Sequence, residues 1–188
     1  MITLRKATKK DSKTIAKLAM YAMADIVYEF IGEKNNDKAI DFLTQLVEME
    51  QNQYSYENIL IFEHENETAG FCITYDGAKL ETLRRPVLNV LATKYNRNIN
   101  PQNETEEGEI YIDCIATFPE FRGKGIGSFI LDYLIEDIGH KQNKTLGLLV
   151  DLTNPRAQKL YEAKGFKVVG EKQLMSENHY HLQYKKGS

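Results

Sequence analysis

The stretch Glu109–Ser128, EIYIDCIATFPEFRGKGIGS, decides the fold of this chain. Its first half reads as a strand, the chain breaks at residues 118–120 (FPE), and a glycine-rich turn then leads into an amphipathic helix. Gly123, Gly125 and Gly127 carry no Cβ, so their backbone can come close to a ligand. The unpaired N–H groups and the positive dipole end of the following helix favour an anion there. The turn therefore predicts a phosphate or pyrophosphate site; the alternative is an ordinary glycine-rich connection.

The composition is that of an ordinary globular protein. The chain has 188 residues, of which 42% are hydrophobic and 27% charged, and its net charge is -3. No basic cluster is long enough for a nucleic-acid face, and no segment approaches the roughly 18 apolar residues of a spanning helix. Cys72 and Cys114 each lie in an expected strand, which favours buried free thiols in a reducing compartment. We therefore expect a single cytoplasmic domain, 1–188, that binds neither nucleic acid nor membrane.

The N-terminal half predicts a strand, two helices and a hairpin. Ile2–Lys6 reads as a strand, and Asp11 as the N-cap of a helix whose apolar positions are Ile15, Leu18, Ala19, Ala22 and Ile26. A second helix is expected over Asp37–Met49. The hairpin strands are expected at Ile59–Glu63 and Ala69–Tyr75, with Gly70 marking a bulge or a close backbone approach. Residues 76–108 have poor periodicity and read as an irregular insertion, within which one short helix could follow Pro86.

The C-terminal half alternates helices and strands. The glycine turn opens a helix that Gly139 is expected to stop, with the apolar stripe Ile126, Phe129, Ile130, Tyr133, Leu134 and Ile138. Strands are expected at Thr145–Leu152, Phe166–Val169 and His179–Tyr184. Asn154 should cap a helix whose inner face is Ala157, Leu160 and Tyr161. The order strand–helix–helix–hairpin–strand–helix–strand–helix–strands predicts an α/β (α+β) fold with helices on both faces of a mixed sheet.

Two nucleotide-binding motifs fail by their spacing. A P-loop requires G-x-x-x-x-G-K-[ST], whereas Gly123-Lys124 is followed by Gly125 and residue 118 is not glycine. A dinucleotide fingerprint requires G-x-G-x-x-G, whereas this turn is G-x-G-x-G and no early βαβ unit surrounds it. Neither motif therefore accounts for this glycine turn.

Two sequence blocks resemble the GNAT superfamily of acyl-CoA N-acyltransferases. RGKGIG at 122–127 is similar to the family's Q/R-x-x-G-x-G/A signature, and CIATFPEF at 114–121 precedes it as in such proteins. The second block runs from Asn154 through Tyr161 to Gly165-Phe166 and looks like N-x-x-A-x-x-x-Y-x-x-x-G-F. Two blocks in the right order are more specific than either alone. The strong resemblance covers residues 109–170 and implies a GNAT-like fold for the single domain.

The resemblance also implies where acetyl-CoA, the acyl donor, would bind. The pyrophosphate would rest on the glycine turn, formed by Arg122, Gly123, Lys124, Gly125, Ile126, Gly127 and Ser128. The pantetheine arm would pair with the strand residues Ile115, Ala116 and Thr117, whose amide can polarise the thioester carbonyl. Asn154 matches a position that contacts the cofactor arm, besides its role as an N-cap. Tyr161 matches the general acid that protonates the leaving thiolate; the alternative is a tyrosine of the helix core. No metal is expected.

A general base for the amine is harder to assign. Some family members use a glutamate of this strand, but the matching position here is Tyr111. Glu109 and Asp113 flank it on the same strand face, and Asp113 is the first choice because it is closer along the chain to the acyl site. A structural or solvated strand aspartate is the alternative. Asp151 is a weaker candidate because it can simply turn the chain, and the histidines of the last strand read as pairing residues.

The function expected from this resemblance is transfer of acetyl from acetyl-CoA to a primary amine by direct attack in a ternary complex. The alternatives are a catalytically weak acyl-CoA-binding module and an interaction protein that docks through residues 76–108. The acceptor is a small-molecule or protein amine whose identity the sequence does not fix, and a homodimer is possible. The acceptor side would be built from the region 21–30, the insertion and the terminal strands. The acidic run 104–107 weakly favours a cationic acceptor over a plain solvated loop.

Overall fold

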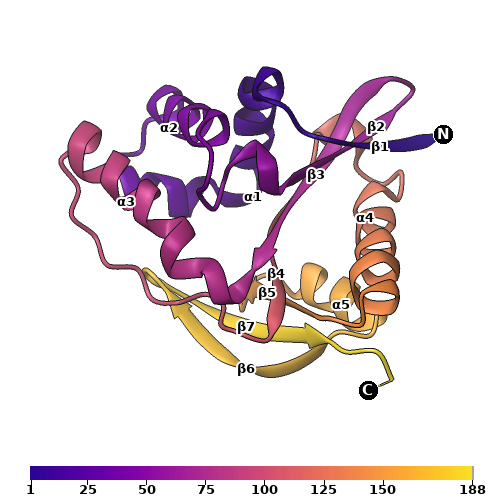
Figure 1. Cartoon of the computed structure of the whole chain (residues 1–188). Coiled ribbons are helices and arrows are strands. Elements are labelled where there is room, and N and C mark those ends of the chain that lie inside the picture. Colours follow the sequence, from indigo (N-terminus) through magenta and orange to yellow (C-terminus); the bar gives the residue numbers. More distant parts are fainter. Residues whose placement is uncertain (188) are drawn as a thin grey trace. The chain divides into compact units, whose positions relative to one another are not determined.

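The computed structural model of the chain describes residues 1–187 (Figure 1). Its strands are β1 (Ile2–Lys6), β2 (Ile59–His64), β3 (Glu67–Asp76), β4 (Glu109–Thr117), β5 (Thr145–Asp151), β6 (Lys167–Leu174) and β7 (Glu177–Tyr184). Its α-helices are α1 (Ser12–Ile31), α2 (Asn36–Glu48), α3 (Leu80–Tyr95), α4 (Ile126–Leu134) and α5 (Pro155–Ala163). Short helical turns are η1 (Lys9–Asp11), η2 (Tyr56–Asn58), η3 (Gly77–Lys79), η4 (Pro119–Phe121) and the π-helical η5 (Ile135–Lys141).

The sheet is mixed, which confirms the predicted fold class. Its strands follow the order β1-β2-β3-β4-β5-β7-β6. β4 and β5 pair in parallel, whereas β1 with β2, β2 with β3, β5 with β7 and β6 with β7 are antiparallel. The chain divides into two compact units: unit 1 holds 1–73, 81–100 and 114–127, and unit 2 holds 74–80, 101–113 and 128–188. β3 and β4 each contribute residues to both units.

Unit 1 contains the paired helices α1 and α2. Both elements were predicted, and the helices pack against each other. Ile15 and Leu18 are buried as expected, but Ala22 is exposed. The reason is a kink at Met23, whose φ of -136° and ψ of 26° are not helical. The kink shifts the buried face, which continues with Val27 and Phe30.

The hairpin of β2 and β3 forms where the sequence predicts it. Glu65 and Asn66 in its turn both have positive φ, 54° and 65°, as in a type I′ turn. The register shifts between Phe62 and Glu63, so a bulge lies beside Gly70. A Cβ on Gly70 would meet the Ala116 carbonyl at 2.8 Å. Both readings of this glycine, a bulge and a close backbone approach, are therefore confirmed.

The expected irregular insertion is wrong for its first half. Residues 80–95 form the regular helix α3, with Pro86 inside it, and only 96–108 lack regular structure. The buried residues Leu80, Arg84, Val87 and Leu91 keep helical spacing. Because one of the four is an arginine, the apolar periodicity is interrupted, and the sequence predicted only the part of the helix that follows Pro86.

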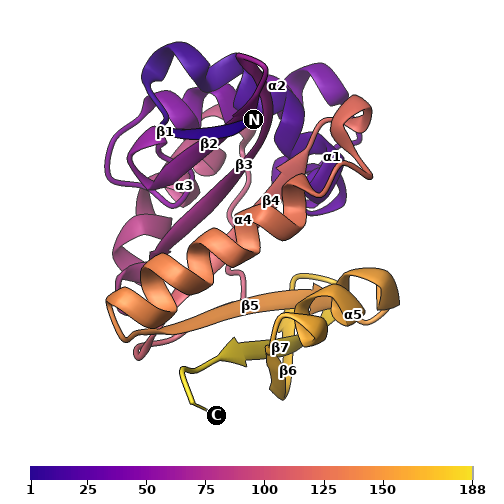
Figure 2. The ribbon, with the colours of Figure 1, turned by 90° about the vertical axis from the view of Figure 1, so that its right-hand side faces the viewer.

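Unit 2 contains the three neighbouring strands β5, β7 and β6 (Figure 2). Gly139 was expected to stop the helix before β5, but η5 continues the chain helically to Lys141. Gly139 is buried, and a Cβ there would lie 3.0 Å from the Tyr184 ring. The missing side chain of Gly139 leaves space for the Tyr184 ring, and the residue does not end the helix. The buried face of α4 also differs from the apolar stripe that the sequence predicted, because Leu131 is buried while Phe129 is 39% exposed.

The two units differ in how much apolar core they hold. Phe166 is the one member of the largest fully buried side chains, among residues 1–187, that lies in unit 2. Those in unit 1 are Phe42, Phe62, Phe71, Ile15, Leu18, Leu43, Leu46, Ile59, Ile61, Ile73 and Leu91. Leu146 and Leu182 add to the smaller buried set of unit 2. Cys72 and Cys114 are buried free thiols, as predicted, and burial raises the pKa of Cys72 to about 12.

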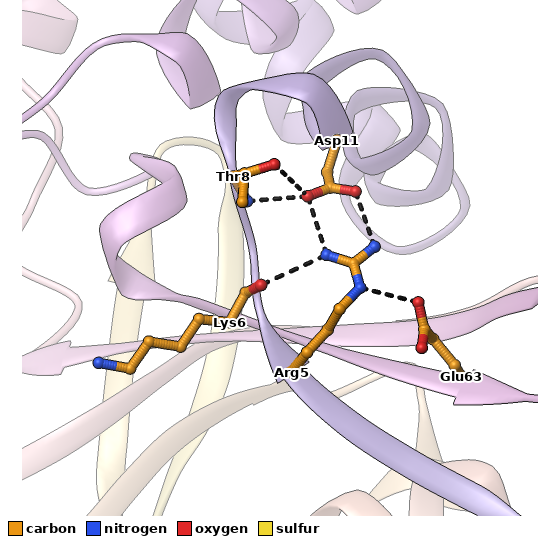
Figure 3. Close-up of polar contacts among 5 residues, drawn as sticks. All are labelled: Arg5, Lys6, Thr8, Asp11 and Glu63. Carbon is orange, nitrogen blue, oxygen red and sulfur yellow. Dashed lines mark hydrogen bonds and ion pairs between the residues drawn. The ribbon is translucent and has the colours of Figure 1, made fainter. Parts of the chain in front are cut away.

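An ion-pair cluster in unit 1 ties β1 to β2 and to the start of α1 (Figure 3). The Arg5 guanidinium donates from Nη1 and Nη2 to both oxygens of Asp11, at 3.0 and 2.8 Å, and from Nε to Glu63 at 2.7 Å. Asp11 stands at the N-cap of α1, as predicted, but its carboxylate accepts from the N–H and hydroxyl of Thr8 instead of capping the helix. The hydrogen bond with Arg5 outweighs burial and lowers the pKa of Asp11 from 3.8 to about 2.

Asp11→Asn is expected to lower the free energy of unfolding at pH 7 by about 1 kcal/mol. The pKa shift alone corresponds to about 2 kcal/mol, and we reduce this because the Arg5 side chain is 38% exposed. Since the folded-state pKa is depressed, this stability is present above pH 3.8 and is lost as the pH falls through about 2. Urea titrations at pH 7 and pH 2.5 measure it. If the difference in the free energy of unfolding between the variant and the wild type does not shrink at the lower pH, the ion pair is contradicted. Asp25→Asn, at an exposed position of α1, is the control.

Candidate active site

The glycine turn in unit 1 has backbone angles that glycine permits and other residues rarely adopt. Gly123 and Gly125 have φ of 76° and 79°, in the left-handed region that residues with a Cβ avoid. The turn follows η4, where the Arg122 N–H donates to the Pro119 carbonyl, and α4 begins at Ile126. A Cβ at 123, 125 or 127 would meet nothing within 4 Å. The backbone here therefore faces open space at three positions.

The cations of the turn are held by aromatic rings. The Arg122 guanidinium lies 5.4 Å from the centroid of the Tyr21 ring, and the Lys124 ammonium lies 5.0 Å from that of Phe121. Within residues 1–187 neither cation forms an ion pair. Two positive charges without a counter-charge, beside the first turn of a helix, are what an anion such as a phosphate requires.

The end of β4 leads into this turn. Ile115, Ala116 and Thr117 are its last residues, and the N–H of the next residue, Phe118, donates to the Ala69 carbonyl at 3.0 Å. Ala116 is buried, whereas Ile115 and Thr117 are half-buried. Gly70 of β3 approaches Ala116 and Thr117 closely enough to exclude a Cβ. The glycine of β3 thus fixes the course of the strand segment expected to bind the pantetheine arm.

Unit 2 carries the second sequence block. Asn154 caps α5 as predicted, because its Oδ1 accepts from the Ala157 N–H at 3.1 Å. Tyr161 is half-buried, with its ring 6.1 Å from that of Phe166. The expected inner face of α5 is wrong for Leu160, which is 38% exposed, whereas Ala157 and Tyr161 are half-buried. No residue of the helix is fully buried. A core role for Tyr161 is therefore weaker than the helix pattern indicated.

Glu109 lies in a buried polar cluster of unit 2 that we call the Glu109 cluster: Thr105, Glu109, His181 and Gln183. The carboxylate accepts from Thr105 Oγ1 at 2.6 Å and from Gln183 Nε2 at 2.7 Å, and His181 Nε2 lies 2.9 Å away. Its side chain is 0% exposed. Burial raises the pKa of Glu109, but the hydrogen bonds of His181, Thr105 and Gln183 outweigh it, so the pKa lies below its ordinary value.

Asp113 stands in a different environment, four residues along β4. The Tyr75 hydroxyl donates to its Oδ2 at 2.9 Å and lies 3.3 Å from Glu104 Oε1. Tyr75 is 5% exposed, and its ring packs edge-on against Tyr111 at 5.7 Å. Asp113 itself is half-buried. It thus combines partial access to solvent with an oriented carboxylate.

Asp151 turns the chain, as the sequence suggested. Its Oδ1 accepts from the N–H and the hydroxyl of Thr153, at 2.6 and 2.7 Å. The bond from the Thr153 backbone is the main cause that lowers the pKa of Asp151. A carboxylate occupied in this way has no evident catalytic role.

Several site residues could not be read from the sequence. His181 was read as a pairing residue, and Gln183, Thr105 and Tyr75 had no motif, because their partners lie on distant segments. Tyr21 belongs to the aromatic region 21–30 that was expected on the acceptor side. Its contact with Arg122 joins it to the turn instead.

In the part of the chain that the structure describes, no group of three His, Cys, Asp or Glu residues could hold a metal ion. Over the same residues, 1–187, no helix is long and apolar enough to cross a membrane.

The chain is similar in sequence and in fold to known acetyltransferases. The profile of the acetyltransferase (GNAT) family matches residues 33–166. The chain is 31% identical over 121 residues to the mycothiol acetyltransferase of Acidimicrobium ferrooxidans; this covers 63% of the chain but only 35% of that protein. The chain thus spans about a third of the length of this curated relative.

Two solved structures match along almost the whole chain. A crystal structure described as an acetyltransferase has a TM-score of 0.77 and 32% identity, covering 97% of this chain and 98% of that one. The N-acetyltransferase of Staphylococcus aureus Mu50 has a TM-score of 0.81 and 26% identity, covering 97% and 100%. The chain therefore belongs to the GNAT family of acetyltransferases.

Proposed function

We propose that this protein transfers acetyl from acetyl-CoA to a primary amine by direct attack within a ternary complex. Membership of the GNAT family implies acetyl-CoA as the donor and an amine as the acceptor. Similarity to the N-acetyltransferase of Staphylococcus aureus, which extends over 97% of the chain, supports transfer to nitrogen. The family profile draws on both compact units, which supports one N-acetyltransferase domain.

The glycine turn is the observation that carries this proposal. Two glycines in the left-handed region and two cations that form no ion pair within residues 1–187 stand before a helix, and such an arrangement favours an anion. The pyrophosphate of acetyl-CoA would rest on the turn, which comprises Arg122, Gly123, Lys124, Gly125, Ile126, Gly127 and Ser128. The N–H groups of Arg122 and Lys124 already donate to the carbonyls of Pro119 and Phe121, so the hydrogen bonds to the ligand would come from the other N–H groups of the turn. Gly127 is helical, with ordinary φ, and has open space around its Cα. Its lack of a side chain leaves room for the phosphates.

Ile115, Ala116 and Thr117 would hold the pantetheine arm as an added strand, and an amide of this segment would stabilise the oxyanion of the tetrahedral intermediate. Asn154 of unit 2 uses its Oδ1 to cap α5, so its NH₂ group is the one that would donate to the cofactor arm. The cap keeps the side chain oriented before the cofactor binds.

Asp113 is our first candidate for the base that takes a proton from the acceptor ammonium. Its carboxylate is oriented by the Tyr75 hydroxyl and is half-buried. Glu109 is the second candidate. Its oxygens are occupied by three neighbours, and its lowered pKa makes it a weaker base. The neutral amine then attacks the thioester carbon, a C–N bond forms and the C–S bond breaks.

Tyr161 is the proposed general acid. Its phenol would donate a proton to the thiolate of CoA as the C–S bond breaks. The ring contact with Phe166, and the hydrogen bond from the Phe166 N–H to the Tyr161 carbonyl at 3.1 Å, fix where α5 presents this residue.

Thiol release from acetyl-CoA across a panel of amines tests the proposal. We expect at least one of a polyamine, an aminoglycoside, an N-terminal peptide and a lysine peptide to raise the rate above that without amine. A thermal-shift titration with acetyl-CoA runs in parallel, and saturating ligand at 100 times its Kd should stabilise the fold by about 2.7 kcal/mol. Stabilisation without amine-dependent release would favour a binding module. If acetyl-CoA does not stabilise the fold and no amine raises the rate of thiol release, the proposal is overturned.

A further inference from the structure

The cations of the glycine turn share a feature that the phosphate site by itself does not require. Each lies against an aromatic ring of unit 1, Arg122 on Tyr21 and Lys124 on Phe121. Phe121 is 7% exposed and contacts the His64 ring at 5.9 Å, so it belongs to the packed body of the unit. Tyr21 is different, because it comes from α1 and is 55% exposed. A large aromatic ring this exposed is not there to fill a core.

Tyr21 is nevertheless held in place. Its ring makes an edge-on contact with Phe118, with centroids 6.3 Å apart and planes at 74°. Phe118 is itself anchored, since its N–H donates to the Ala69 carbonyl. Tyr21 also precedes the kink of α1 at Met23 by two residues. The ring therefore has two neighbours that restrict it, Phe118 at a steep angle and the Arg122 guanidinium over its face.

The geometry points to Tyr21 as a positioning residue of the phosphate-binding turn: its ring holds the Arg122 guanidinium ready for a phosphate group of CoA. This inference rests on the proposed function, since it names a further residue of the same site. A free arginine side chain loses rotamer freedom when it binds a phosphate, and that loss weakens binding. A guanidinium already held on a ring has lost much of that freedom before the ligand arrives.

The ring leaves the donors of the guanidinium available. The guanidinium carries five N–H donors in a planar fork, and contact with one ring does not use all of them. Arg122 makes no ion pair within the described residues 1–187, so no carboxylate competes with a phosphate for those donors. The hydroxyl of Tyr21 plays no part in this arrangement. Replacing tyrosine by phenylalanine should therefore keep the effect.

A double-mutant cycle on CoA binding, measured by isothermal titration calorimetry, tests the inference. We expect Tyr21→Leu to raise the Kd for CoA about fivefold and Arg122→Gln about tenfold. The double variant should bind about as weakly as Arg122→Gln alone, because the ring acts only through the arginine. Tyr21→Phe should bind within about twofold of wild type. Circular dichroism and the Tm of each variant establish that the fold is retained.

Tyr56→Leu is the matched control, because Tyr56 makes the same kind of contact with Lys9 in unit 1, 5.6 Å from ring centroid to ammonium. It should leave CoA binding unchanged. A fiftyfold loss in the double variant, or an unchanged Kd for Tyr21→Leu, would overturn the role of Tyr21 while the wild type still binds CoA. If the wild type does not bind CoA, the proposed function itself fails, so the two failures are distinguishable.

Discussion

Gly147→Ala is expected to lower the Tm of the protein by about 10 °C, a loss of about 3 kcal/mol in the free energy of unfolding. Gly147 lies in β5 opposite Tyr111 of β4 and opposite Gln183 of β7. A methyl group there would overlap the Glu109 carboxylate. That carboxylate is fully buried and holds Thr105, His181 and Gln183, so it cannot move without breaking its hydrogen bonds.

Unit 2 is the place where this loss should matter, because few of the largest buried side chains lie in it. Differential scanning calorimetry measures the effect. Gly170→Ala is the control in the same unit, since a Cβ there meets nothing within 4 Å and its φ is ordinary. If both variants melt within 2 °C of wild type, the Glu109 cluster is not the rigid buried network that the contacts indicate.

The second large effect is expected on turnover. Tyr161→Phe should lower kcat about 100-fold while the Kd for CoA changes less than about twofold, because the lost phenol acts on the leaving thiolate and not on binding. Asp113→Asn should lower kcat by a similar factor, because the acceptor ammonium loses the group that takes its proton. Asparagine keeps the oxygen that the Tyr75 hydroxyl contacts at 2.9 Å.

The pH dependence of kcat separates the two roles. Removing the base should flatten the acidic limb of the profile, and removing the acid should flatten the basic limb. Glu109→Gln supplies the comparison, because this change breaks a buried network and should lower the Tm as well as the rate. Equal losses of CoA affinity and turnover in Tyr161→Phe would make that tyrosine a packing residue. A flattened acidic limb in Glu109→Gln but not in Asp113→Asn would move the base to Glu109.

The fold class could be predicted because its signals are local. Alternation of apolar residues, the turn at Glu65-Asn66 and the Asn154 cap each depend on a few neighbouring residues, and each is found in the structure. Prediction failed where a distant contact overrides the local pattern. Gly139 looks like a stop signal but makes room for the Tyr184 ring. Only the part of α3 after Pro86 was predicted, because Arg84 occupies the buried face of the helix.

The candidate site also has parts that the sequence predicts and parts that it does not. The glycine turn and the Asn154–Phe166 block are continuous stretches whose chemistry depends on order and spacing, so the family could be named from them. The environments of the two carboxylates could not be read. Glu109 and Asp113 look alike on the strand face, yet one is enclosed by the Glu109 cluster and the other is oriented by Tyr75.

The sequence by itself determined the mixed α/β fold, the family and the position of the glycine turn, because glycine dihedrals and strand periodicity are properties of short segments. Only the tertiary structure decided which side chains surround that chemistry. His181 lies 72 residues from Glu109 along the chain. Tyr21 lies in α1 and contacts Arg122 of the glycine turn. Such contacts leave no periodic trace, because they depend on how strands and helices far apart in sequence pack together.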